Sequence, residues 1–150
     1  MTFLRRFAQL ASIGALPLAV AIASQSAAPA LANVVQPAIT VSQLAGPWAV
    51  SLTGDTGCGI TTAYFTVTLN SSGSGTANEV QHTSACGDLT GSAPFAIVSL
   101  NANGSGTAHL SCGSGCGWDF NIQVSRNRQE FNLVDVTNPG NYFEGIAIRQ

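Results

Sequence analysis

Apolar and polar residues alternate along most of the chain after residue 46. Residues 60–69 show this most clearly, because Ala63, Phe65, Val67 and Leu69 share one side of an extended chain while Thr and Tyr side chains share the other. Successive side chains of a strand point to opposite faces, so this period of two predicts strands with one buried face and one solvated face. The pattern predicts eight strands, at residues 48–53, 60–69, 76–84, 95–100, 107–111, 118–124, 130–136 and 142–149.

Turn residues separate the predicted strands, and one turn sequence occurs twice. Residues 69–77 read LNSSGSGTA, and residues 100–108 read LNANGSGTA. Asn and Gly tolerate the positive φ that tight hairpins need, so both segments predict hairpin turns. A calcium loop is the alternative for the second segment, but it would lack carboxylate ligands. The sequence therefore predicts an all-β fold, an eight-stranded antiparallel meander barrel or a closely related β-sandwich with two disulfides.

The first 32 residues have the organisation of a cleavable signal peptide. Arg5 and Arg6 precede a run rich in Ala, Leu, Ile and Val, and Ala30 and Ala32 supply the small side chains that signal peptidases accept. A retained transmembrane helix is the alternative, although the apolar run is short for a span of about 20 residues. We expect cleavage after Ala32 and an exported protein, periplasmic or secreted.

Beyond the signal peptide the sequence indicates a single domain. Removing 32 of 150 residues leaves 118, enough for one modest core. We expect residues 33–46 to form an N-terminal leader and residues 47–150 to form one β-barrel domain. No membrane span is expected after signal cleavage.

The charge of the expected mature chain excludes one class of partner. Residues 33–150 contain Arg126, Arg128 and Arg149, no lysine, and seven Asp or Glu, a formal net charge of −4. Nucleic-acid binding depends on cations that neutralise phosphates, so no nucleic-acid partner is expected.

All four cysteines lie in the expected mature domain, at Cys58, Cys86, Cys112 and Cys116. An even number of cysteines in an exported chain favours two disulfides over thiol chemistry or zinc. In a meander these residues lie in the first, third and fifth loops, at one end of the sheet. The register of the hairpin centred on Gly73 favours Cys58–Cys86 with Cys112–Cys116, and the two other connectivities stay open.

The polar side chains of the domain do not form a recognisable catalytic or metal site. Glu79, Glu130, Asp135 and Glu144 lie on predicted strands, and we expect these carboxylates on outward, solvated faces. The histidines, at positions 82 and 109, are expected on the surface. We therefore predict no catalytic residues, no metal and no cofactor.

The aromatic and basic side chains also have structural explanations. Trp48 and Trp118 are expected in the core or on the barrel floor rather than against a ligand. Arg126 and Arg128 fall in the turn after the sixth predicted strand, where charge is usual.

The segment Leu44-Ala45-Gly46-Pro47-Trp48, at the head of the first predicted strand, resembles the Gly-x-Trp opening of three families of eight-stranded barrel. These are the lipocalins, the avidins and the periplasmic inhibitors of secreted bacterial metalloproteases. The inhibitors give the closest local match, and the resemblance implies that residues 33–40 could be an arm that enters a protease cleft. The chain departs from the inhibitors in its four cysteines.

These observations predict an exported, non-enzymatic binding module that recognises a small ligand or a protein outside the cytoplasm. Two alternatives stay open, an inhibitor of a secreted or periplasmic protease and a low-charge structural envelope protein. The ligand-binding residues cannot be named from the sequence. A hollow interior of about 300 Å³ or more would favour a small ligand.

Overall fold

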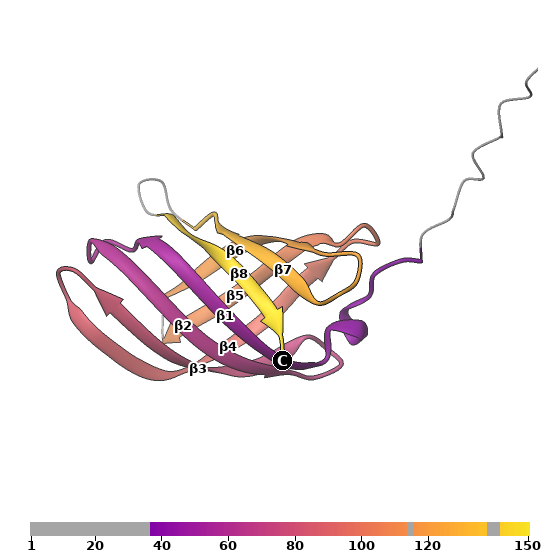
Figure 1. Cartoon of the computed structure of the whole chain (residues 1–150), viewed down its shortest axis with the longest axis horizontal. Helices are drawn as coiled ribbons and strands as arrows, with labels where there is room; N and C mark the ends of the chain where they lie inside the picture. Colours follow the sequence, from indigo (N-terminus) through magenta and orange to yellow (C-terminus); the bar gives the residue numbers. More distant parts are fainter. Residues whose placement is uncertain (1–36, 114–115, 138–141) are drawn as a thin grey trace, which may run out of the picture. The chain divides into compact units, whose positions relative to one another are not determined.

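The structure, a computed structural model, describes residues 37–113, 116–137 and 142–150, with the side chains of residues 112–116 outside the described part. A short 3₁₀ helix, η1, precedes eight strands (Figure 1). The elements are η1 (Val41–Leu44), β1 (Gly46–Asp55), β2 (Ile60–Leu69), β3 (Ser74–Thr83), β4 (Gly87–Leu100), β5 (Ser105–Gly113), β6 (Cys116–Val124), β7 (Glu130–Asp135) and β8 (Tyr142–Arg149).

The eight strands form a closed antiparallel barrel in chain order, with β8 paired to β1. The β1–β8 ladder runs from the pair Trp48 and Arg149 to the pair Asp55 and Tyr142. This confirms the predicted meander barrel, and the sandwich alternative is wrong because the first and last strands pair.

The largest difference from the predicted strands is in β4. It begins at Gly87, not at residue 95, while the other strand ends differ from prediction by two residues or fewer. Residues 87–94 contain Gly, Asp, Ser and Pro, which are typical of turns. They are nevertheless extended because they pair with β3, from Gly87 opposite Thr83 to Phe95 opposite Gly75.

Apolar side chains from all eight strands fill most of the barrel. The ring centroids of Trp48 and Phe131 lie 4.9 Å apart, and those of Phe65 and Phe95 lie 5.8 Å apart. Aromatic pairs at these separations add attraction beyond the burial of their surface. The largest fully buried side chains are Trp48, Phe65, Phe95, Phe120, Phe131, Phe143, Leu44, Leu52, Leu69, Leu110, Leu133 and Val50.

One end of the barrel, here called the closed end, is covered by η1 and the residues before it (Figure 1). Leu44 of η1 is fully buried, and the indole N–H of Trp48 donates a 2.8 Å hydrogen bond to its carbonyl oxygen. The guanidinium of Arg149 lies over the Trp48 ring at 5.5 Å and donates to the carbonyl oxygen of Gln43. Hydrogen bonds from the side chains of Trp48 and Arg149 to carbonyl oxygens of η1 therefore tie η1 to both the first and the last strand.

The segment before η1 also packs on the barrel. Ile39 is buried, and its N–H donates to the carbonyl oxygen of Ala102 at 3.0 Å. Residues 37–40 of the expected leader are thus part of the closed end, while residues 33–36 lie outside the described part. Within the described residues, no helix has the length and hydropathy needed to cross a membrane.

The two copies of the repeated turn sequence both form hairpins at the closed end. Gly73 and Gly104 have positive φ values of 81° and 87°. The side-chain oxygen of Asn70 accepts from the backbone N–H of Ser72, and that of Asn103 accepts from the N–H of Ser105. These Asn side chains satisfy the turn backbone, as predicted for hairpins.

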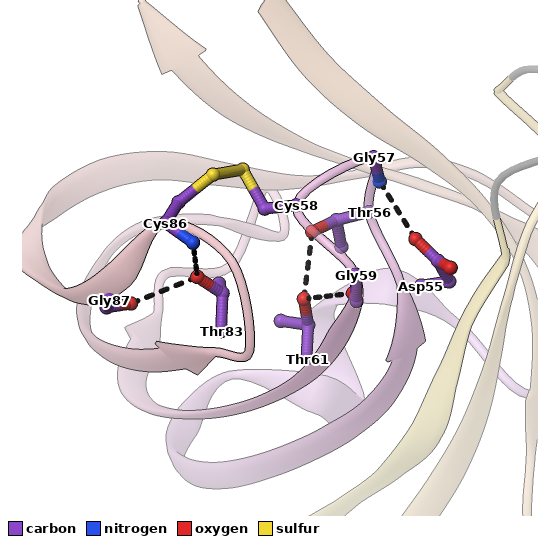
Figure 2. The surroundings of a disulfide bond; sticks show 9 residues. All are labelled: Asp55, Thr56, Gly57, Cys58, Gly59, Thr61, Thr83, Cys86 and Gly87. Atoms are coloured by element: carbon purple, nitrogen blue, oxygen red, sulfur yellow. Dashed lines mark hydrogen bonds between the residues drawn. A yellow bond between two sulfur atoms is a disulfide. The ribbon is translucent and has the colours of Figure 1, made fainter.

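A disulfide links the loops at the other end, here called the mouth, where β1 and β3 finish and β2 and β4 begin (Figure 2). Cys58 and Cys86 are bonded, with their Cα atoms 5.5 Å apart, the pairing that the hairpin register predicts. The fold prediction counted two disulfides, and the described part of the structure holds one. The side chains of Cys112 and Cys116 lie outside the described residues, so their predicted pairing stays a prediction.

Candidate ligand-binding site

Among the described residues, strand pairing within the closed barrel is incomplete on one side of the mouth. Strand β4 pairs with β3 from Gly87 to Ala96, but its ladder with β5 runs only from Phe95 to Leu100. Among the described strands, residues 87–94 therefore have a partner on one edge only. Pro94, which has no N–H to donate, lies in this stretch, a usual position for proline in a sheet.

A cavity of about 500 Å³ lies beside this free edge of β4, and we call it the mouth pocket. It is bounded by β3, β4, β5 and β6. The lining residues are Glu79, Gln81, Leu89, Thr90, Gly91, Ser92, Ala93, Pro94, Ser111 and Trp118. Its volume is in the range of sites that hold small organic ligands.

Part of the pocket exists because β4 carries a glycine where it faces the barrel interior. Gly91 alternates with the buried Ala93 and Phe95, so it belongs to the inward face. A Cβ placed on Gly91 would meet no atom within 4 Å, which shows open space above it. Leu89, next on the same face, is 50 % exposed. The inward face of β4 is thus packed from Ala93 to Ile97 and open toward Gly87.

The mouth half of the interior is polar where the closed end is apolar. The buried polar side chains of the described residues are Thr61, Gln81 and Thr83, all near the mouth. The Thr83 hydroxyl donates to the carbonyl oxygen of Gly87 and accepts from the N–H of Cys86 (Figure 2). The Thr61 hydroxyl donates to the carbonyl oxygen of Gly59. These threonines fix the loops that carry the disulfide.

Glu79 is the charged residue of the pocket. The prediction that it lies on an outward, solvated face is wrong, because Ala77, Glu79 and Gln81 alternate on the inward face of β3. The same prediction is wrong for Asp135, which follows Phe131 and Leu133 on the inward face of β7 and is half-buried. Its Oε1 atom is shielded from solvent and has no hydrogen-bond partner among the described residues. Burial raises the pKa of the Glu79 carboxyl above its usual range, because desolvation disfavours the charged form.

Trp118 lines the mouth pocket from β6 and also packs against the core. It is half-buried, and its ring centroid lies 5.9 Å from that of Phe143. We expected it in the core or on the floor. The structure places it at the border of the core and the pocket, where it packs against the core and also lines the pocket.

The two histidines lie on the outer surface, as predicted. His82 pairs with Asp88, and His109 Nδ1 lies 2.7 Å from Asp119 Oδ1. The side chains of both pairs are at least 40 % exposed, so each pair contributes little to stability. Among the described residues, no three His, Cys, Asp or Glu side chains are grouped as metal ligands would be.

A second cavity of about 480 Å³ lies at the closed end. It is lined by Pro37, Ala38, Ile39, Ala102, Asn103, Arg126 and Arg128. Its walls are the segment before η1 and the β4–β5 and β6–β7 turns. The mouth pocket, by contrast, is bounded by four strands.

Sequence reasoning missed Glu79, Gly91 and the first half of β4 as parts of a site. A signal for Glu79 was present, because Ala77 faces inward and strand periodicity then places residues 79 and 81 on the same face. No comparable signal marked residues 87–94, whose composition is that of a loop.

Comparison with known proteins gives the fold class of the chain. No family model matches it, and no curated protein matches it. Solved structures do match, among them one described as a "De novo design of a fluorescence-activating beta barrel". That similarity has a TM-score of 0.50 and 14 % sequence identity, and it covers 75 % of this chain and 99 % of the designed one. At this identity the similarity shows the eight-stranded barrel fold alone.

Proposed function

We propose that the protein is an exported, non-enzymatic binding module that takes a small organic ligand into the mouth pocket. The observation that carries this proposal is the cavity of about 500 Å³ at the free edge of β4, with the inward face of Gly91 left open. The pocket combines apolar walls with a few polar groups, the usual composition of a small-molecule site.

The similar designed barrel supports the proposal at the level of the fold. It is described as fluorescence-activating, which is compatible with binding as a role for this architecture. Export is supported by the signal-like residues 1–32 and by the Cys58–Cys86 disulfide, since disulfides persist mainly in oxidising compartments.

A protease-inhibitor role is less well supported. It needs a free arm at residues 33–40, whereas Ile39 is buried and hydrogen-bonded to Ala102. No observation on the described residues favours a structural envelope role over binding.

The test is a fragment screen followed by ¹⁵N NMR of the two tryptophan indoles. Trp118 lines the pocket, while Trp48 is fully buried at the closed end and serves as an internal control. We expect ligands of the pocket to shift the indole cross-peak of Trp118 and leave that of Trp48 unchanged.

The matched variants are Gly91→Phe and Val80→Phe. The first places a ring in the open space of the pocket, and the second places the same ring on the outer face of β3, where Val80 is 56 % exposed. Gly91→Phe should abolish the response of Trp118 and Val80→Phe should preserve it. A full screen in which no fragment moves Trp118, or in which Gly91→Phe leaves binding intact, would overturn the proposal.

A further inference from the structure

The mouth pocket contains an acceptor without a donor. Glu79 Oε1 is buried and unpaired, and Glu79 is the single ionisable side chain among the described residues that line the pocket. A buried carboxylate oxygen without a hydrogen bond is costly, and a charged donor offers the strongest compensation. The described lining contains no Lys or Arg, so a cationic ligand would supply a charged donor that these side chains do not.

The surface charge around the mouth has the same sign as Glu79. Asp55, Asp88, Asp119 and Glu144 are carboxylates of the mouth half with exposed or partly exposed side chains, and Asp135 adds a half-buried, inward-facing carboxylate there. The three described arginines lie at the closed end, two in the β6–β7 turn and one at the end of β8. This separation makes the field at the mouth negative and raises the local concentration of cations.

The rest of the pocket fits an apolar group attached to a cation. Trp118 presents an indole, a favourable contact for both ammonium ions and aromatic rings. Leu89 and Pro94 add apolar surface on the β4 side. The cavity of about 500 Å³ exceeds what a bare ammonium ion would fill.

We infer that the ligand of the mouth pocket is a primary or secondary organic ammonium ion with an apolar substituent. The ammonium N–H donates to Glu79, and the substituent contacts Trp118 and Leu89. This inference rests on the proposed function and names the ligand class of the same site.

The test compares three ligands of one size and different charge. These are 2-phenylethylamine as the cation, 2-phenylethanol as the neutral analogue and phenylacetate as the anion, each titrated while the Trp118 indole is followed by NMR. We expect the amine to bind at least about tenfold more tightly than the alcohol, and phenylacetate to bind most weakly. Added salt should weaken binding of the amine and leave the alcohol unchanged.

The decisive variant is Glu79→Gln, with Glu144→Gln as the matched control. Glu144 lies on the exposed outer face of β8, outside the pocket. Glu79→Gln should remove the preference for the amine while the alcohol binds as before. Glu144→Gln should change the preference by less than about twofold, because it alters only the screened surface field.

The possible results separate this inference from the proposed function. Equal binding of amine and alcohol, or a preference for the amine that survives Glu79→Gln, would overturn the inference while ligand binding itself stands. Failure of the amine to bind would also overturn it. The proposed function is judged separately, by the fragment screen and the Gly91→Phe variant.

Discussion

The two ends of the barrel are built from the same strands but held together differently. At the closed end, Trp48 is fully buried between η1 and Phe131, and the turns at Gly73 and Gly104 pack beneath residues 39–41. At the mouth, the inward positions carry Glu79, Gln81 and Gly91 and leave a cavity. Stability is therefore concentrated at one end, and the other end is free to carry a site.

The β1–β8 and β4–β5 junctions, here called the two strand seams, differ in the same way. Where β1 meets β8, a Cβ on Gly145 would lie 1.9 Å from the carbonyl oxygen of Ser51, so the two backbones are in close contact. Where β4 meets β5, residues 87–94 have no partner on that side among the described strands. A covalent link, Cys58–Cys86, fastens the mouth loops where core packing is thin. This contrast leads to predictions that can be ranked by size.

The largest expected effect comes from truncating the tryptophan at each end. Trp48→Ala removes a fully buried ring and its hydrogen bond to Leu44, and should lower the free energy of unfolding by about 3–5 kcal/mol. Trp118→Ala removes a half-buried ring beside an existing cavity and should cost about 1–2 kcal/mol. Urea denaturation of both variants measures the difference. Equal losses would contradict the view that the closed end holds most of the stability.

Removing the disulfide should have the next largest effect. The double variant Cys58→Ser with Cys86→Ser opens a loop with a sequence separation of 28 and should cost about 3 kcal/mol. Because the link lies at the mouth, amide hydrogen exchange should increase first near Thr61 and Thr83, while residues around Trp48 keep their protection. Exchange that rises first at the closed end would reverse the assignment of the weaker end.

Two glycine substitutions compare the two seams directly. Gly145→Ala forces a methyl group against the β1 backbone and should lower the free energy of unfolding by about 2–3 kcal/mol. Gly91→Ala places the same methyl group in open space and should change stability by less than about 0.5 kcal/mol. Thermal or urea unfolding of both variants is sufficient. A large loss for Gly91→Ala would mean that the mouth pocket is tighter than the structure shows.

Much of the fold could be predicted from the sequence because its signals are local. The alternation in residues 60–69 predicted β2 with both ends correct, and the repeated turn sequence, rich in Asn and Gly, predicted two hairpins in their places. The pairing of Cys58 with Cys86 followed from the register of one hairpin. Each of these inferences depends on residues that are close in sequence or joined by one turn.

The site was harder to predict because it depends on a strand whose own sequence does not favour strand formation. Residues 87–94 contain Gly, Asp, Ser and Pro, and they are extended because β3 provides a partner, which is a tertiary effect. Glu79 was assigned to the surface on residue type, and burial against an open cavity is the exception to that rule. A pocket formed by a missing ladder and a missing Cβ leaves little trace in hydropathy.

The smallest expected effect concerns the stability contribution of Glu79 itself. Burial raises the pKa of the Glu79 carboxyl in the folded state, so the folded protein holds this proton more tightly than the unfolded chain. The stabilisation that comes from binding this proton is therefore fully present below the usual pKa of a glutamate. It is lost as the pH rises through the raised pKa of Glu79 in the folded state. Above that window the charged, unpaired carboxylate destabilises the fold.

Glu79→Gln should accordingly stabilise the free protein at neutral pH by up to about 1 kcal/mol, a modest value because the side chain is only half-buried and water screens it. The gain should disappear at pH values below the usual pKa of a glutamate. Denaturant unfolding across the pH range measures it, with Glu144→Gln, on the exposed face of β8, expected to stay within about 0.5 kcal/mol throughout. A gain that grows as the pH falls would contradict the sign of the shift. Lower stability of the empty barrel together with tighter binding of a ligand is what we expect of a residue whose role is binding.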